Sequence, residues 1–354
     1  MMKRIVLLFL VWLPLFVEAQ NKIINIGTAE EFRSFAQSVN EGNDYEGRNI
    51  VLTSNIDLGD EDWTPIGSSS KQFKGTFDGK GHWVSNLNVN AVMSNNAGLF
   101  GYIGEGGSVT RLGVASGTVR VKEKTSFNVE CYAGGIAAQC EGTISQCANM
   151  ATIYGNQLEA RVGGIAGVIL ESGIVEDCYN WGRLYTSRIY EDNNYLGGIA
   201  GGADDYTIRR VYVDAAIDGG SAPHNAGIVA ETLGFEETPA QDAYYSEGDA
   251  YYDQDDIRCG ESMLGFELDG KLNRRGDYTI WSFAEGRLPL LSQMTELLWG
   301  DVNLDGEVSI ADVTYLVNII LGKARVNHMA DVNRDGDVSI ADVTALVNII
   351  LGRE

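Results

Sequence analysis

Gly163-Gly164-Ile165-Ala166-Gly167 is one of five short segments that recur along the middle of this 354-residue chain. Each segment has one or two glycines followed by an apolar residue. The glycine before the apolar residue stands at 98, 135, 164, 198 and 227, at intervals of 37, 29, 34 and 29 residues. The other four segments are Ala97–Gly101, Gly134–Ala137, Gly197–Gly201 and Ala226–Val229. Such a repeat predicts a chain built from similar coils.

A second segment follows the glycine markers, and in it side chains alternate with period two. Its copies are Gly113–Val119, Cys147–Ile153, Cys178–Leu184 and Val211–Ile217. This alternation indicates short strands. A unit of about 30 residues without a long helical pattern is typical of a solenoid, whereas a β-propeller blade needs about 40 or more. We therefore predict a mainly β protein whose core is a parallel β-helix.

Stacked coils place equivalent residues above one another at the strand spacing of about 4.8 Å. Aligning the copies by pattern predicts two inward ladders: Gly113, Cys147, Cys178 and Val211, and Ala115, Asn149, Asn180 and Val213. Cys147 and Cys178 would then touch, as a buried thiol pair or as a disulfide between coils. Asn149 and Asn180 would form a small amide ladder or occupy turns.

Both ends of the predicted solenoid carry capping signals. Thr28–Glu31 is a capping box, and Phe32, Phe35, Ala36 and Val39 follow at helical spacing. This helix would cover the open end of the stack, where unpaired strand edges invite aggregation. Asn49–Leu58 is expected to supply the first strand pair. Trp281 and the apolar run Leu288–Leu291 are expected to close the other end.

Three segments near the N-terminus carry a family resemblance. Trp63–Gly67, Phe73–Gly79 and Ser85–Leu87, followed by the glycine segments, resemble the GLUG-motif proteins, which are exported bacterial proteins and in many cases adhesin-like. The resemblance covers about 25–295. It implies a parallel β-helix more firmly than any ligand. The partner expected for the β-helix is a glycan or a host or surface protein.

The first residues have the pattern of an export signal. Lys3 and Arg4 precede an apolar run from Ile5 to Val17, and Val17-Glu18-Ala19 places small residues before Gln20. We predict a signal peptide at 1–19 cleaved before Gln20, and a secreted or cell-surface protein. The apolar run is shorter than the roughly 20 residues of a membrane span, so no membrane span is expected. The predicted domains are then 20–295, the β-helix, and 300–354.

The charge of the chain restricts its partners. A formal net charge of −23 makes nucleic acid an unsuitable ligand, because phosphate binding needs lysine and arginine. Residues 236–269 are strongly acidic and predict either a solvated loop or a further calcium site. The five cysteines, at 131, 140, 147, 178 and 259, include no CxxC pair, and we interpret them mainly as buried small apolar side chains.

Two acidic loops near the C-terminus carry the most specific chemistry. Asp301–Gly322 recurs as Asp331–Gly352 with 19 of 22 positions identical. Oxygen donors at loop positions 1, 3, 5, 7, 9 and 12, with glycine at position 6, are the ligand pattern of an EF-hand calcium loop. The sequence therefore predicts two Ca²⁺ sites. The predicted ligands are Asp301, Asn303, Asp305, Glu307, Ser309 and Asp312 in the first loop, and Asp331, Asn333, Asp335, Asp337, Ser339 and Asp342 in the second.

One helix is expected after each loop, and Trp299-Gly300 leaves no room for a helix before the first. Loop then helix, twice, resembles a type I dockerin. The resemblance implies a cohesin-like protein receptor and two docking orientations related by a half turn. The alternative is that the apolar residues of the implied face pack between the two halves or on the β-helix. That partner-binding face would consist of Ile310, Ala311, Asn318 and Ile319, or of Ile340, Ala341, Asn348 and Ile349.

Motifs for catalysis are sparse. The chain has no HExxH, GxSxG or P-loop motif, and Asp204, Asp205 and Asp214 are the carboxylates that a polysaccharide-acting β-helix enzyme would use. We expect no enzyme activity. The predicted function is an exported binding or adhesion scaffold tethered through its dockerin-like tail. The alternative is a lyase or hydrolase of polysaccharides recruited by the same tail.

Overall fold

The computed structural model describes residues 23–59, 61–91, 95–121, 130–155, 160–171, 173–186, 194–218, 224–233, 240–245, 272, 280–282, 289–294, 299–303, 307–324, 328–333 and 337–353. The predicted signal peptide, Cys259, the predicted ligands Asp305 and Asp335, and most of the acidic stretch 236–269 lie outside these residues.

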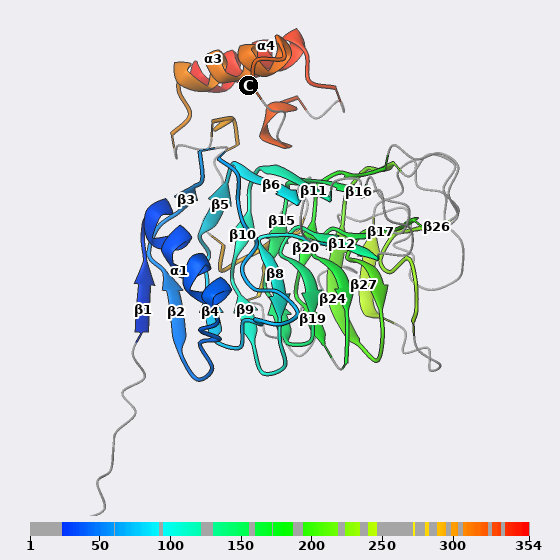
Figure 1. Ribbon diagram of the computed structural model, residues 1–354. Coiled ribbons are helices and arrows are strands. Elements are labelled where there is room, and N and C mark those ends of the chain that lie inside the picture. The colour runs from blue at the N-terminus through cyan, green and yellow to red at the C-terminus, as the bar shows by residue number, and fades with distance from the viewer. Residues whose placement is uncertain are drawn as a thin grey trace, which may run out of the picture.

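The middle of the chain winds into coils of five short strands, as the repeat predicted (Figure 1). The first full coil has β4 (Thr76–Asp78), β5 (Trp83–Ser85), β6 (Leu87–Ala91), β7 (Asn96–Ala97) and β8 (Phe100–Ile103). The second has β9 (Ser108–Thr110), β10 (Gly113–Val114), β11 (Gly117–Val121), β12 (Cys131–Gly134) and β13 (Ala137–Cys140).

The next coils repeat this order. The third has β14 (Thr143–Ser145), β15 (Ala148–Asn149), β16 (Thr152–Gly155), β17 (Ala160–Gly163) and β18 (Ala166–Ile169). The fourth has β19 (Ile174–Glu176), β20 (Tyr179–Asn180), β21 (Leu184–Tyr185), β22 (Asn194–Gly197) and β23 (Ala200–Ala203). Then follow β24 (Thr207–Val213), β25 (Ile217–Asp218), β26 (His224–Ala226) and β27 (Gln241–Tyr245).

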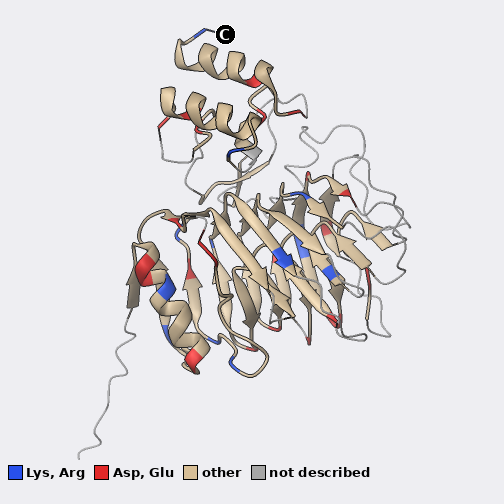
Figure 2. Cartoon of the chain, turned by 45° about the horizontal axis from the view of Figure 1, so that its top comes forward, with Lys and Arg blue, Asp and Glu red and all other residues tan. Residues whose placement is uncertain are grey.

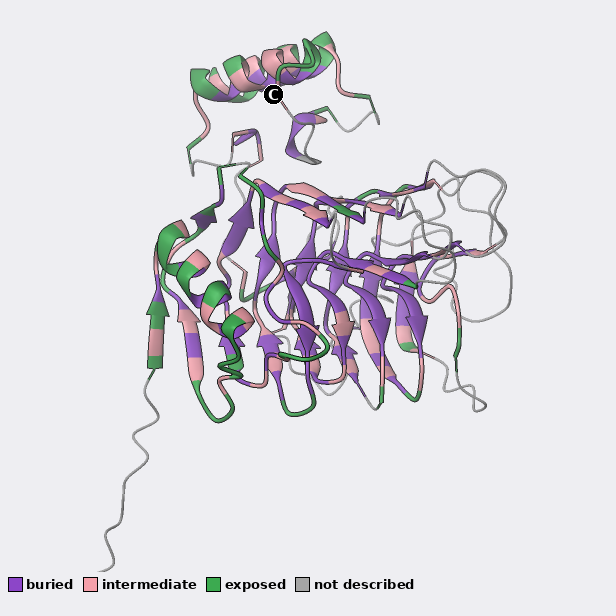
Figure 3. Ribbon diagram, in the orientation of Figure 1, coloured by how far each residue is buried: buried purple, intermediate pink, exposed green. Residues whose placement is uncertain are grey.

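Each strand pairs in parallel with its equivalents in the neighbouring coils, so the fold is a parallel β-solenoid. The side faces of the stack are the sheets β25-β21-β16-β11-β6, β26-β22-β17-β12-β7 and β23-β18-β13-β8. Side chains that face inward form apolar ladders, which fill the purple interior in Figure 3. One such ladder consists of Phe77, Val109, Ile144, Val175 and Ile208, each at most 2% exposed.

The predicted ladders are correct for three coils and displaced by one residue in the first. Ala148 pairs with Gly113, and Asn149 pairs with Val114. The ladder of Asn149, Asn180 and Val213 therefore continues to Val114 rather than Ala115, and Gly113 lies level with Ala148 rather than with Cys147. The register beyond this corner is as predicted, because Val119 pairs with Ile153. One extra residue between Val114 and Thr118 produces the shift.

The amide ladder and the turn predicted for the two asparagines are both present. Asn149 Nδ2 donates to Asn180 Oδ1 at 2.8 Å, and both side chains are fully buried. Each Oδ1 also accepts from a backbone N–H two residues later, at Ala151 and Gly182. The glycine markers make room for this ladder, because a Cβ on Gly164 would lie 2.2 Å from Asn180.

The predicted N-terminal cap is confirmed. Thr28 is the N-cap of α1 (Ala29–Glu41), its side chain forms a capping box with Glu31, and the four predicted apolar residues are buried. Phe32 packs on Phe77 with ring centroids 5.7 Å apart, so the helix lies over the first coil. The sheet at this end contains β1 (Ile23–Ile26), which the sequence did not predict, as well as β2 (Asn49–Leu52) and β3 (Ile56–Asp57).

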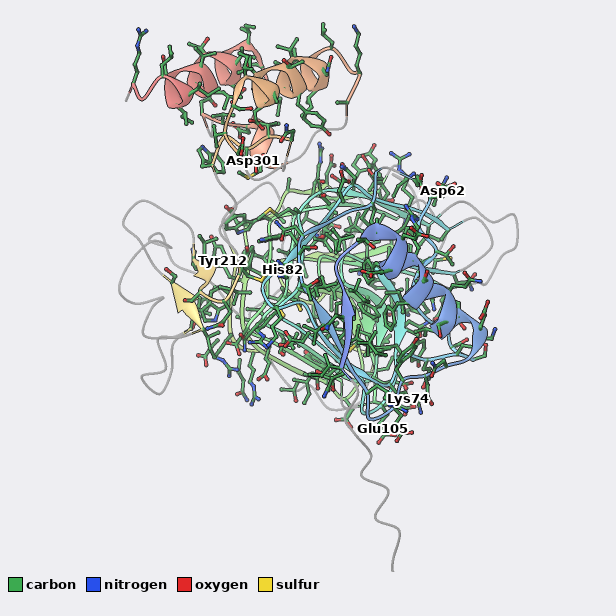
Figure 4. The ribbon with its side chains drawn as sticks, turned by 90° about the vertical axis from the view of Figure 1, so that its left-hand side faces the viewer. Asp62, Lys74, His82, Glu105, Tyr212 and Asp301 are labelled. Atoms are coloured by element: carbon green, nitrogen blue, oxygen red, sulfur yellow. The ribbon has the colours of Figure 1, made fainter. Side chains whose placement is uncertain are left out.

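The predicted closure of the far end by Trp281 and Leu288–Leu291 is not what the structure shows. β28 (Trp281–Ser282) and β29 (Leu290–Leu291) form an antiparallel pair along the side of the stack. They pack on outward-facing rings and small side chains from successive coils, beside Tyr212 in Figure 4. Those residues are Trp83, Ala115, Ala148, Met150, Tyr179, Tyr212 and Tyr244.

The C-terminal tail contains two α-helices, α3 (Ile310–Ile320) and α4 (Ile340–Ile350), with the 3₁₀ helix η1 (His328–Ala330) between them. In Figures 1 and 2 the two α-helices lie side by side above the solenoid. Among the described residues, no helix is both long and apolar enough to cross a membrane.

Candidate metal centre and docking surface

Each tail helix begins with the same cap. Ser309 Oγ accepts from Ala311 N at 3.1 Å, and Ser339 Oγ accepts from Ala341 N at 3.1 Å. Asp312 and Asp342 complete the capping boxes from the third helical position. A carboxylate there is favoured because the helix dipole is positive at its N-terminus.

The same two aspartates join each loop to its helix. Asp312 Oδ1 accepts from Asn303 N at 3.0 Å, and its Oδ2 accepts from Ser309 N at 2.7 Å. Asp342 receives the equivalent bonds from Asn333 N at 3.1 Å and Ser339 N at 2.8 Å. Both carboxylates are fully buried. The loop backbone therefore already curves around the side chain at position 12.

The other predicted ligands lie along these loops with graded exposure. Asp301, which Figure 4 labels, is 2% exposed at the start of the first loop. Its equivalent Asp331 is half-buried. Asn303, Ser309 and Ser339 are half-buried, while Asn333, Glu307 and Asp337 are exposed. The described portion of the loops, which omits Asp305 and Asp335, contains no cluster of three or more metal-binding side chains.

These residues fit a hard cation. Buried carboxylates are costly without a compensating positive group, and Asp301 and Asp312 lie buried in one loop. The predicted donors of both loops are all oxygen atoms, which Ca²⁺ prefers to nitrogen and sulfur. A bound calcium ion would neutralise this local charge and fix the loop against the helix that follows it.

The structure separates the predicted partner-binding residues into two groups. Ile310 and Ile340 are each 71% exposed at the helix starts. Ala311, Ala341, Asn348 and Ile349 are also exposed, and Asn318 is half-buried. Ile319, by contrast, is 4% exposed in the core between the helices. Ile319 therefore does not belong to an open face, and the alternative of packing between the halves holds for this side chain.

The core of the tail joins its two halves. Both loops contribute the apolar residue at their second position, Val302 and Val332, and both helices contribute leucines, Leu316 and Leu346. Trp299 Nε1 donates to the Val332 carbonyl at 3.1 Å, so the residue before the first loop holds the second. Loop and helix positions are thereby fixed as one unit.

The carboxylates considered for catalysis are not brought together. Asp204 and Asp205 precede β24, whereas Asp214 follows its last residue, so the whole strand separates them. The structure also brings together four side chains on the solenoid that the sequence did not indicate as a cluster. Tyr132, Arg161, Tyr195 and His224 are register partners on β12, β17, β22 and β26.

This cluster is held by charge as well as by stacking. Arg161 forms ion pairs with Glu130 at 3.1 Å and with Glu231. The hydrogen bond from the Tyr132 hydroxyl is the main cause that lowers the pKa of Glu130, and burial raises the pKa of Tyr132. The partners come from neighbouring coils, so an accurate strand register was needed to find them in the sequence.

The comparisons with known proteins agree with the geometry of the tail. The family model for the dockerin type I domain matches residues 299–351. Domains of this family bind calcium and attach the proteins that carry them, typically extracellular ones, to cohesin-bearing assemblies. The C-terminal tail is thus a dockerin type I domain, and Ca²⁺ is its cation.

Two relatives match parts of the chain. Halomucin of Haloquadratum walsbyi is 30% identical over 148 residues, which are 39% of this chain and 2% of that protein. A putative Gly-rich membrane protein of Evansella cellulosilytica is 35% identical over 75 residues, 21% of this chain and 9% of that protein. The matched parts are therefore small fractions of both relatives. No solved structure matches the chain.

Proposed function

We propose that this chain is an exported, non-catalytic binding scaffold, with a β-solenoid over 20–295 that the dockerin domain at 300–354 tethers to a cohesin-bearing assembly. The observation that carries the proposal is the duplicated tail. Two near-identical loop–helix units each display an exposed isoleucine, Ile310 or Ile340, beside a calcium loop. The signal peptide pattern at 1–19 supports export, and the GLUG-like segments support adhesion as the role of the solenoid.

The docking face consists of two related sets, one on each helix, and the first is smaller because Ile319 is buried and Asn318 is half-buried. We assign Ile310 and Ala311 to the first, and Ile340, Ala341, Asn348 and Ile349 to the second. Large exposed apolar side chains mark interaction surfaces, and six of the eight in the described chain lie in this tail: Ile310, Ile320, Leu321, Ile340, Ile349 and Leu351. The two sets would present one receptor with two binding orientations.

Binding of the full chain to immobilised cohesin domains tests this face. Ile310→Asp or Ile340→Asp alone should leave most binding, because the other set still docks. The double variant should lose at least about a hundredfold in affinity, since a buried unpaired charge is strongly unfavourable at an interface. Ser69→Asp, an exposed solenoid residue, adds the same charge elsewhere and serves as control. Retention of binding by the double variant would remove this face from the proposal.

The non-catalytic role is tested by turnover. Polygalacturonate and neutral glucans incubated with the full chain should keep their length, as followed by size-exclusion chromatography and by release of reducing ends. If a polymer is shortened and Asp214→Ala abolishes the shortening, the chain is instead a lyase or hydrolase that uses the same tether.

A further inference from the structure

The outer face of the five-stranded sheet β25-β21-β16-β11-β6 carries a row of planar side chains. Arg120 pairs with Tyr154, and Tyr154 pairs with Tyr185, on three successive coils. Their chain neighbours Val119 and Ile153 are fully buried in the core. Because alternate residues of a strand point to opposite faces, the row points outward. Arg120 is exposed and the two tyrosines are half-buried.

The members of the row hold one another in place. The Arg120 guanidinium lies 4.3 Å from the centre of the Tyr154 ring, and the Tyr154 and Tyr185 rings are 5.4 Å apart in an edge-to-face arrangement. Arg183 lies 5.8 Å from the Tyr185 ring. Such contacts restrict the side chains before any ligand arrives, which lowers the entropy lost on binding.

The row brings arginines together on an acidic protein. The whole chain carries −23, yet Arg120 lies in the row and Arg183 lies beside Tyr185, after which Asp218 follows in register. Arg183 is paired with Asp218 at 2.9 Å, and Asp62 at the edge accepts from Asn88 at 3.2 Å. Arg120 is exposed on the row, and a guanidinium fork matches the geometry of a carboxylate.

Stacked coils give the row the shape of a track. Successive side chains are separated by about 4.8 Å, the spacing between strands, and Thr118 and Thr152 run beside them as register partners. The C–H face of a sugar ring packs on an aromatic ring, and hydroxyl groups bond to threonine. We propose that this row binds an extended polysaccharide bearing carboxylates, with Tyr154 and Tyr185 contacting sugar rings and Arg120 binding a uronate. The inference rests on the proposed function, because it names the ligand of the scaffold.

Binding of polygalacturonate to the full chain tests the proposal. Calcium cross-links this polymer, so the titration is made in EGTA and followed by calorimetry. Tyr154→Ala, Tyr185→Ala and Arg120→Gln should each weaken binding at least about tenfold, the effect of losing one charged hydrogen bond or stacked ring. Tyr154→Phe keeps the ring and should bind like the parent. Lys74→Gln removes a cation at the edge away from the tail (Figure 4) and should also bind like the parent.

The outcomes separate this proposal from the tether. Dextran, which has no carboxylates, should bind at least about tenfold more weakly than polygalacturonate. Equal binding of the two polymers, or polygalacturonate binding that the three row variants leave unchanged, would overturn the proposal. So would a complete lack of polygalacturonate binding. If the same samples still bind cohesin in calcium, the tether stands and only the row is wrong.

Discussion

At the residue scale, interactions between near neighbours were predictable from the sequence. The capping box at Thr28 involves residues three positions apart, so the pattern alone identified it. The equivalent boxes at Ser309 and Ser339 were seen only in the structure, because the calcium-loop pattern had assigned these serines as ligands. Exposure was harder to predict. Ile319 and Ile349 occupy equivalent positions in helices that differ only at Tyr315 and Ala345, yet one is 4% and the other 39% exposed. The difference arises from packing between two halves that are not equivalent in their surroundings.

The carboxylates at loop position 12, Asp312 and Asp342, are expected to be essential for calcium binding. Asp312→Ala removes the position-12 carboxylate and both backbone bonds that it accepts, so the first loop should lose its calcium. Calorimetric titration should show the number of sites falling from two to one, and Asp342→Ala should do the same for the second loop. Thr314→Ala, on the exposed side of α3, is the control. Two sites remaining in Asp312→Ala would refute the ligand assignment.

The buried side chain of Asn149 is expected to stabilise the stack of coils. Asn149→Ala removes one of the two donors to Asn180 Oδ1 and leaves the Ala151 N–H without its acceptor inside the core. Burial of unsatisfied polar groups should lower the free energy of unfolding by about 1–3 kcal/mol. Urea denaturation measures this loss, with the exposed Asn43→Ala as a control that should cost about 0.5 kcal/mol or less. Equal effects of the two changes would mean that the amide ladder does not stabilise the stack.

At the element scale, the repeat predicted strands and coils, but corners and distant contacts escaped it. Every coil turns its first corner through a residue with positive φ: Gly81, Arg111, Gln146, Asp177, Arg210 and Asp242. Only one is glycine, so composition did not reveal the corner. The hairpin β28–β29 escaped prediction for another reason. Its Trp281 donates to Asp177, 104 residues away, and no local pattern encodes so distant a contact.

Trp281 tests whether that hairpin is part of the core. The ring is 1% exposed, and Trp281→Ala should lower the free energy of unfolding by about 3–5 kcal/mol. Trp281→Phe keeps an aromatic ring and loses the bond to Asp177, so it should cost less. Leu233→Ala, at an exposed residue, is the control for urea denaturation. A loss below about 1 kcal/mol in Trp281→Ala would show that the hairpin merely lies on the solenoid.

At the scale of the whole molecule, two different kinds of order are joined in one chain. The solenoid depends on long apolar ladders such as Phe77 to Ile208, which require no metal. The tail has a small core and buries the carboxylates of Asp301, Asp312 and Asp342, which calcium would compensate. The tail was predictable because its loop pattern is local and repeated. The tyrosine and arginine row was not, because it exists only once coils are stacked in register.

Calcium dependence of cohesin binding by the full chain tests the tethered scaffold most directly. The chain is passed over immobilised cohesin domains in calcium and then in EGTA, and bound mass is recorded by surface plasmon resonance. Binding is expected in calcium only, and it should be lost in the double variant Asp312→Ala with Asp342→Ala. Equal binding in EGTA, or no binding to cohesin domains in calcium, would mean that the tail is not a calcium-dependent tether.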